Sequence, residues 1–313
     1  MLVFIARRLL SGVILLLVIS IVAFSLLYLD SANIARRILG QNATAELVAQ
    51  KTSELGLDRP LLAQYGDWIT SALTGDFGRS WFNGQLVSVS LSGRLAVSLS
   101  LVIGATLVSA IIAVVLGVLA ARRGGWVDAL VQFISVVGFA IPGFLIALYL
   151  VLIFAINLKL FKATGYIPIT TSFTGWLSSV TLPIIALSIG AIAAVAQQIR
   201  GSVSDALSRD YVRTLRSRGL SSGSVVYKHV LRNAGGPALA VLAVQFVGLL
   251  GGAVIVESIF ALPGMGQLTV SATTQGDIPV VMGVVVAFAV IVIVVNLLID
   301  LAQAALNPKV RLS

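Results

Sequence analysis

Few residues in this chain are able to do covalent or metal chemistry. Its 313 residues include no cysteine and one histidine, His229, which excludes a thiolate nucleophile, a disulfide and Cys-based metal sites, and also most His-based ones. A triad hydrolase needs a base beside a nucleophile, but His229 lies in a basic, polar stretch, so we interpret it as a packing or hydrogen-bonding residue. No Gly-x4-Gly-Lys-Ser/Thr run occurs, so ATP is not bound through a Walker A loop.

Two carboxylates, Glu257 and Asp300, lie near the ends of apolar segments. A charged side chain costs about 2.5–3.5 kcal/mol at the centre of a membrane helix on insertion scales and less near an interface, so each should face protein or water. The two residues could form an intramembrane acid pair, but neither belongs to a protease-type motif. Backbone groups or Asn296 would serve equally well as structural partners, and an intramembrane enzyme is therefore disfavoured.

The composition places these residues in a membrane protein. Hydrophobic residues make up 58% of the chain and charged residues 11%, which is outside the usual range of soluble domains. A net charge of +9 would suit nucleic acid, but the basic residues stand at the ends of apolar segments without interleaved aromatic residues. Membrane topology explains the charge better, and no nucleic-acid partner is expected.

Six segments are long and apolar enough to span a bilayer as helices, which takes roughly 20 residues. The third contains Pro142 and should be tilted or kinked. The first follows Arg7 and Arg8, and it exceeds the roughly 7–15 residues of a signal-peptide core, so we expect an uncleaved transmembrane helix. The six predicted spans are Leu9–Leu29, Leu95–Ala121, Val127–Ile156, Ser178–Ile199, Pro237–Ile259 and Val280–Leu306.

Basic residues indicate the orientation of these spans. If the spans alternate, the basic groups at 7–8, 122–123, 200–232 and 309–311 share one side, which the positive-inside rule makes cytoplasmic. Both termini are then cytoplasmic. The outside segment 30–93 is too long for a connector, and its helical spacing, interrupted at Pro60, predicts short helices above the membrane. With no repeat and no linker in view, we expect one transmembrane domain over 1–313.

A basic, polar stretch from Ser202 to Asn233 lies between two long apolar segments. Its pattern predicts two short helices that meet near Gly219 and dock on a soluble partner. A plain positive-inside loop would explain the arginines, but not the glycine spacing or the run from Lys228 to Asn233. The predicted apolar face carries Tyr211, Val212 and Leu215, and the charged face carries Arg213, Arg216 and Arg218.

A second stretch, VESIFALPGMGQL from Val256 to Leu268, predicts a sharp turn at the outer face. Pro263 cannot continue a helix, and Gly264 and Gly266 permit tight backbone paths. The stretch could be a gate or merely a turn. Small residues such as Gly248, Gly251 and Gly252 in the preceding span allow close helix contact, which is ordinary membrane packing.

Several motifs resemble those of one transporter family. The text DYVRTLRSRGL, followed by KHVLRNA and Pro237, resembles the EAA loop of ABC-importer permeases in the dipeptide/oligopeptide/nickel group. FIARRLL, ELGLDRPLLAQYGDW, GDFGRS, VESIFALPGMGQL and NLLIDLAQAALNPKVR resemble the B-type permease subunit, so the likeness covers nearly the whole chain. Leu215 stands where alanine is usual, and Asn307 and Lys309 stand where Asp and Arg are common.

The resemblance implies an all-α polytopic membrane protein with about six transmembrane helices in a type I ABC-importer permease fold, and with a helical extracytoplasmic insertion. It implies half of a translocation pathway for di- or oligopeptides, without catalysis or a cofactor on this chain. The implied partners are a C-type permease subunit, two cytoplasmic ATPase subunits that bind ATP and Mg, an extracytoplasmic binding protein and the bilayer of a bacterial or archaeal plasma (inner) membrane.

Site residues follow from the resemblance and from the spans. The implied ATPase-coupling residues are Tyr211, Arg213, Thr214, Leu215, Arg216, Arg218, Gly219, His229 and Asn233. The residues expected at the pathway or gate are Pro142, Gln245, Glu257, Pro263 and Gly264. Two alternatives stay open: import of another small solute such as nickel or a haem precursor, and a secondary transporter driven by an ion gradient through Glu257 and Asp300.

Overall fold

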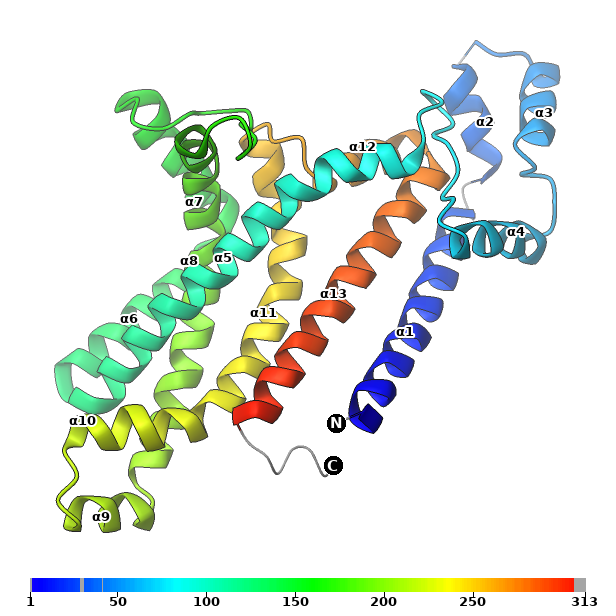
Figure 1. Cartoon of the computed structure of the whole chain (residues 1–313). Coiled ribbons are helices and arrows are strands. Elements are labelled where there is room, and N and C mark those ends of the chain that lie inside the picture. The colour runs from blue at the N-terminus through cyan, green and yellow to red at the C-terminus, as the bar shows by residue number, and fades with distance from the viewer. Residues whose placement is uncertain (1, 29–30, 41, 307–313) are drawn as a thin grey trace. The chain divides into compact units, whose positions relative to one another are not determined.

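The computed structural model describes residues 2–28, 31–40 and 42–306, which form helices joined by turns and loops. Within these ranges the β-pairing is a single isolated bridge between Arg79 and Leu86. The helices (Figure 1) are α1 Leu2–Tyr28, α2 Ser31–Leu39, α3 Ala45–Glu54, α4 Leu61–Leu73, α5 Val87–Arg123, α6 Gly125–Ala140, α7 Gly143–Leu150, the π-helical η1 Val151–Asn157, α8 Phe173–Leu207, α9 Asp210–Ser217, α10 Ser222–Ser224, the π-helical η2 Val225–Val230, α11 Leu231–Ile259, α12 Met265–Gln275 and α13 Ile278–Leu306.

The predicted number of spans agrees with the upper count that the structure allows. Among the described residues, five helices are long and apolar enough to cross a membrane, and a bent pair brings the count to six if it forms one span. The five are α1, α5, α8, the continuous helix from Ser222 to Ile259, and α13. Several helices extend beyond the predicted spans, since α5 begins at Val87 and α8 ends at Leu207.

The predicted third span, expected to be tilted or kinked, is a pair of helical parts. The chain forms α6 and then α7 with η1, and these two parts are bent by 92°. Pro142 is the residue directly before α7, and Ile141 is extended at ψ 120°. Proline lacks the backbone N–H that a helix requires and pushes the residue before it out of the helical region. The predicted kink at Pro142 is confirmed, and it amounts to a break.

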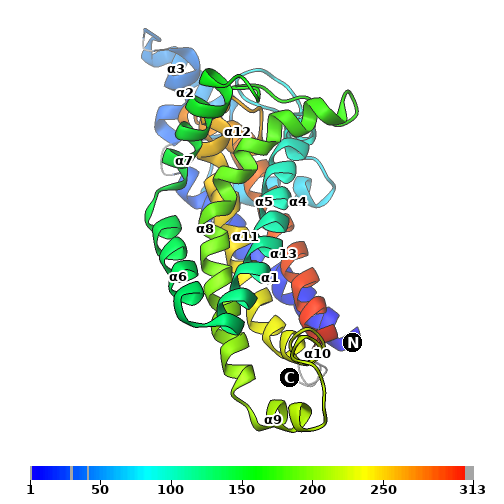
Figure 2. The ribbon, with the colours of Figure 1, turned by 90° about the vertical axis from the view of Figure 1, so that its left-hand side faces the viewer.

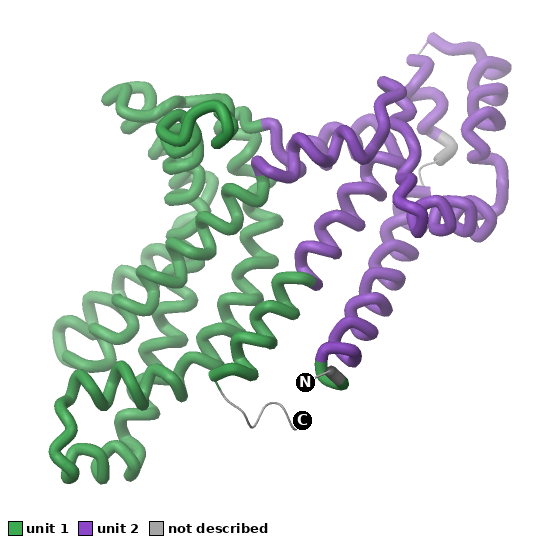
Figure 3. The backbone as a smooth tube through the Cα atoms, in the orientation of Figure 1, with its two compact units in different colours: residues 1–4, 98–262, 294–313 green, residues 5–97, 263–293 purple. Residues whose placement is uncertain are grey.

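Contacts divide the chain into two compact units (Figure 3). Unit 1 comprises residues 1–4, 98–262 and 294–313, and unit 2 comprises residues 5–97 and 263–293. In unit 1, α5 packs closely on α8. A Cβ at Gly104 would come within 2.4 Å of Ile184, and one at Gly117 within 2.8 Å of the Ala196 carbonyl oxygen. At Gly104 the contact is with the end of the Ile184 side chain, which can shift, whereas at Gly117 it is with the backbone, so Gly117 limits how closely the two helices approach.

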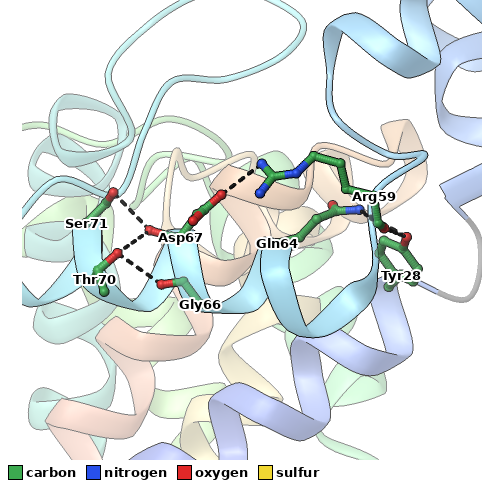
Figure 4. Close-up of polar contacts among 7 residues, drawn as sticks. All are labelled: Tyr28, Arg59, Gln64, Gly66, Asp67, Thr70 and Ser71. Carbon is green, nitrogen blue, oxygen red and sulfur yellow. Dashed lines mark hydrogen bonds and ion pairs between the residues drawn. The ribbon is translucent and has the colours of Figure 1, made fainter.

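Unit 2 contains the predicted short helices of the 30–93 segment. They are α2, α3 and α4. Pro60, where the helical spacing was predicted to be interrupted, is the N-cap residue of α4. Figure 4 shows how side chains fix the entry to α4: the Tyr28 hydroxyl donates to the Arg59 carbonyl, the Gln64 amide donates to the same carbonyl at 2.9 Å, and Arg59 pairs with Asp67 at 2.8 Å. The last part of the segment, from Val87, belongs to α5.

A buried carboxylate holds the loop of the GDFGRS motif in unit 2. Asp277 is 3% exposed and accepts hydrogen bonds from the Ser80 hydroxyl and, at 3.2 Å, from the Trp81 amide. The Ser80 hydroxyl oxygen accepts in turn from the amides of Phe82 and Asn83. Because a buried carboxylate is stable only with such donors, Asp277 and this loop specify each other.

Candidate coupling segment and translocation cavity

The polar stretch 202–233, which we call the coupling segment, begins on the last turns of α8. The chain turns after Leu207, forms α9 over Asp210–Ser217, and turns again at Gly219. Gly219 has φ +80°, and a Cβ there would meet nothing within 4 Å. The glycine is thus required by the backbone conformation, which side chains disfavour, and not by space. Ser221 then caps the next helix by accepting from the Ser224 amide at 3.4 Å.

The second helix of the coupling segment is not a separate short helix as predicted. From Ser222 the chain runs through α10 and η2 directly into α11, without a break. Val225, Val226 and Val230 are buried in a core cluster that also contains residues of α5 and α8. Tertiary packing of these valines explains why the polar composition around them does not interrupt the helix. The π-helical turn η2 lies within this candidate functional segment, and such turns are frequent at functional sites.

The apolar face of α9 points into the chain's own core. Val212 is fully buried in the cluster with Ala113, Val203 and Ala206, while Tyr211 and Leu215 are partly buried against the same cluster. The predicted apolar face of α9 is thus covered by this chain's own core, which leaves the charged face exposed. Leu215, which replaces the usual alanine, adds to this internal packing.

Helix α9 lies at the lower edge of Figure 2, and its other face is charged and exposed. Arg213 and Asp210 approach to 3.8 Å with side chains 81% and 96% exposed, so this pair adds little to stability. The surface available to another protein is therefore cationic and polar. Its exposed members are Arg209, Asp210, Arg213, Thr214, Arg216, Ser217, Arg218, Lys228 and Arg232.

Polar contacts tie the coupling segment to neighbouring helices of unit 1. The Asn233 amide donates to the Tyr211 hydroxyl at 3.2 Å, which joins the two arms of the segment. The Arg122 guanidinium lies 5.9 Å from the centre of the Tyr227 ring, within cation–π range. Arg232 donates to the Leu306 carbonyl at 3.3 Å. His229 is half-buried in η2.

Two predicted pathway residues, Pro142 and Gln245, line one cavity of about 370 Å³ in unit 1. We call it the Pro142 cavity. Gln245 is the one lining residue that carries a polar side chain. The lining residues come from α6, the α6–α7 break, α7, α8 and α11: Gly138, Phe139, Ile141, Pro142, Gly143, Phe144, Ala186, Leu187, Gly190, Ala191, Gln245, Gly248, Leu249, Gly252, Ile255 and Val256.

Glu257 does not line this cavity. It is fully buried near the end of α11 and accepts a hydrogen bond from Ser98. The Ser98 hydroxyl is a structural partner other than the expected backbone groups or Asn296, and an acid pair with Asp300 is not needed to explain the burial of Glu257. Asp300 is half-buried towards the end of α13.

The turn after α11 differs from its predicted form. Gly264 has φ −96° and precedes α12. It therefore does not adopt the positive φ that only glycine tolerates well. The residue with positive φ is Ala261, at +48°, which nothing in its residue type signals. Pro263 is exposed and Gly264 and Gly266 are buried. Asn307 and Lys309, the two departures near the C-terminus, lie outside the described residues.

Sequence reasoning missed the ion pair between Asp128 and Arg200. Arg200 donates from Nε and Nη2 to the two carboxylate oxygens of Asp128, and Gln132 donates to the same carboxylate at 3.1 Å. Arg200 was grouped with the positive-inside cluster. The available signal was Asp128, an acidic residue at the start of an apolar span, but its partner is far away in sequence.

Comparisons with known proteins agree with this architecture. The family described as binding-protein-dependent transport system inner membrane component matches residues 113–312, and its N-terminal companion family matches residues 1–102. A Sinorhizobium fredii protein, named a probable peptide ABC transporter permease protein, is 37% identical over 99% of both chains. The glutathione transport system permease protein GsiC of Salmonella typhimurium is 35% identical over 99% of both.

A solved structure of the MetNI methionine ABC transporter in inward-facing conformations matches with a TM-score of 0.53 and 17% identity, over 67% of this chain and 93% of that one. This likeness concerns the fold alone, and it confirms the predicted type I ABC-importer permease fold. Together with the family matches over both parts of the chain, it leads to one conclusion: the chain belongs to the binding-protein-dependent transport system inner membrane components, the permease subunits of ABC importers.

Proposed function

We propose that this chain is the B-type transmembrane subunit of an importer for di- and oligopeptides and forms half of the translocation pathway. The names of two relatives that match over nearly the whole chain refer to peptides, since glutathione is itself a tripeptide. The assembly would contain a C-type permease subunit, two cytoplasmic ATPase subunits that bind ATP and Mg, and an extracytoplasmic binding protein. It would lie in the bacterial or archaeal inner membrane, with both termini of this chain cytoplasmic, because the basic ends of the spans then share the cytoplasmic side.

In this proposal the coupling segment receives the movement of the ATPase subunits. The observation that carries it is the division of α9 into a buried apolar face and an exposed cationic face. Close-packed side chains transmit displacement because the interior leaves few voids. A partner that moves Arg216 and Arg218 would therefore move Val212, and with it the core shared by α5, α8 and η2. The remaining coupling positions, Thr214, Gly219, His229 and Asn233, would hold the shape of the segment.

The Pro142 cavity would be part of the solute path. A peptide carries amide donors and acceptors that lose water in an apolar wall, and the Gln245 amide offers both a donor and an acceptor. Glu257 lies near the end of α11, and Pro263 and Gly264 lie in the turn that follows it. We assign these three residues to the closure of the path.

The test uses the complete importer in proteoliposomes, with labelled trialanine and labelled glutathione as probes. Arg216→Glu with Arg218→Glu reverses the charge of the docking surface. Uptake should fall about tenfold or more, within the usual range of site-to-site coupling, while the protein still inserts and ATP is still hydrolysed. Arg123→Glu changes an exposed arginine outside the coupling segment and should leave uptake near its normal rate.

Normal uptake by the double variant would refute the coupling role. Uptake of nickel or a haem precursor in place of both peptides would refute the substrate class but leave the coupling role standing. Movement of trialanine by the purified chain alone, driven by an ion gradient without ATP, would favour a secondary transporter instead.

A further inference from the structure

Helix α6 is bounded at both of its ends by a break in the helical backbone. At its start, Gly124 and Gly125 have φ +60° and +53°, and added Cβ atoms there would meet nothing within 4 Å. At its end, the chain breaks at Pro142 with a bend of 92°. Within α6, only Val131 and Ser135 are buried. The helix is therefore joined to α5 and α7 through breaks, and its position depends on its lateral packing contacts with neighbouring helices.

Helix α8 supplies that lateral support, and α6 lies beside it in both views of unit 1 (Figures 1 and 2). The two helices are antiparallel. Asp128 near the start of α6 contacts Arg200 near the end of α8, and further along, a Cβ at Gly138 would lie 3.3 Å from Ile189 and 3.8 Å from Ala193. At these contacts the facing side chains of Ile189 and Ala193 are apolar, so they supply no directional polar contact.

The Asp128–Arg200 ion pair fixes the register of this packing. It is bidentate, and the side chains are 18% and 35% exposed. A planar guanidinium that meets both carboxylate oxygens specifies orientation as well as distance. Partly withdrawn from solvent, the pair is less screened than a surface pair. The ion pair lies at one end of the α6–α8 packing, the end nearer the coupling segment.

The pair also lies between the coupling segment and the Pro142 cavity. On one side, Val203 and Ala206 of α8 share a core with Val212 of α9. On the other side, α8 contributes Gly190 and α6 contributes Phe139 to the cavity wall. We propose that the Asp128–Arg200 ion pair is the positioning contact through which α8 moves α6, so that movement of the coupling segment reshapes the Pro142 cavity. This inference rests on the proposed function.

The chain has no native cysteine, which allows a site-specific test. In the complete importer, Phe139→Cys on α6 and Gln245→Cys on α11 report cavity accessibility through their rates of reaction with a water-soluble maleimide, with and without ATP. In the otherwise normal chain both rates should change with ATP. With Asp128→Asn, the ATP-dependent change at position 139 should fall about tenfold, a typical size for allosteric coupling, while the change at 245 and ATP hydrolysis persist.

Further variants separate positioning from folding. Reversal of both charges, Asp128→Arg with Arg200→Asp, should restore the ATP response at position 139. The single variant Arg200→Lys, in a chain with Asp128 intact, should keep part of that response, because an ammonium group does not pair in the bidentate way. Arg123→Gln removes a nearby exposed cation and should change neither rate. If Asp128→Asn does not assemble, the reversed pair decides: assembly with a response at 139 supports the proposal, and assembly without it overturns the proposal.

Two outcomes distinguish this inference from the proposed function. A full ATP response at both 139 and 245 in the Asp128→Asn chain would overturn the positioning role alone. Absence of any ATP response at 139 and 245 in the chain with an intact pair would instead contradict the coupling that the proposed function requires.

Discussion

The coupling segment and the Pro142 cavity are built in opposite ways. The segment is continuous in sequence, rich in arginine, and held by the apolar side of one short helix. The cavity is assembled from α6, α7, α8 and α11, is mostly apolar, and owes much of its room to glycines such as Gly190 and Gly248. A surface that another protein recognises can be encoded locally, whereas a path through the membrane depends on how distant helices meet. The following predictions test this contrast, from the largest expected effect to the smallest.

Val212→Asp should have the largest effect, because it buries a carboxylate without a partner in the core under α9. We expect a loss of stability of at least about 3 kcal/mol, the scale of an uncompensated buried charge. Thermal unfolding of the purified chain in detergent would measure it. Thr214→Asp, on the exposed side of the same helix, is the matched control. Equal stability of the two variants would show that α9 does not pack as described.

Gly219→Val should uncouple the importer without unfolding it. A β-branched residue at φ +80° is strained by roughly 1–2 kcal/mol, and the strain falls on the turn that orients α9. Trialanine uptake per ATP hydrolysed should drop about tenfold. Gly165→Val carries the same kind of strain, at φ +87° with open space around it, in a different loop. A similar drop in that control would remove the special role of Gly219.

Gln245→Leu tests the cavity with a change of similar volume that removes the amide. Solute amides would lose a hydrogen-bonding partner worth roughly 1 kcal/mol, so peptide uptake should fall about fivefold while ATP hydrolysis is retained. Gln197→Leu changes an exposed glutamine of α8 that does not line the Pro142 cavity and serves as the control. Unchanged uptake of both trialanine and glutathione would place the solute path elsewhere.

Arg213→Gln should have the smallest effect. Its ion pair with Asp210 is highly exposed, so stability should be unchanged within error and uptake should change by less than about twofold. A larger loss of uptake at unchanged stability would identify Arg213 as a direct contact of the ATPase subunit, and would sharpen the assignment of the charged face.

The sequence predicts the coupling segment better than the cavity for physical reasons. Helical spacing and a glycine are local signals, so α9 and the turn at Gly219 can be predicted from the residues. Amphipathicity indicates that Tyr211 and Val212 share a face, but it does not say whether that face meets this chain or another one. In the cavity, proline chemistry predicts a kink at Pro142, while the 92° angle results from tertiary packing.

Contacts between distant residues are beyond such local signals. The partner of Asp128 is 72 positions away, and that of Asp277 is 197 positions away, so neither pairing follows from spacing. The positive φ at Ala261 was likewise not predictable, because glycine is the residue that favours positive φ, and the nearby Gly264 and Gly266 do not adopt it.

The glycines of α5 have a consequence for protein engineering. Replacing a helical glycine by alanine is a common way to make a protein more robust, worth up to about 1 kcal/mol at an open position. Gly66 and Gly201 have open space around them and are candidates for that change. At Gly117 the added methyl group would meet the backbone of α8 and push α5 away from it, whereas at Gly104 it would meet the movable end of the Ile184 side chain. A consensus or library design that treats all helical glycines alike would thus gain heat resistance at Gly66 and Gly201 and lose it at Gly117.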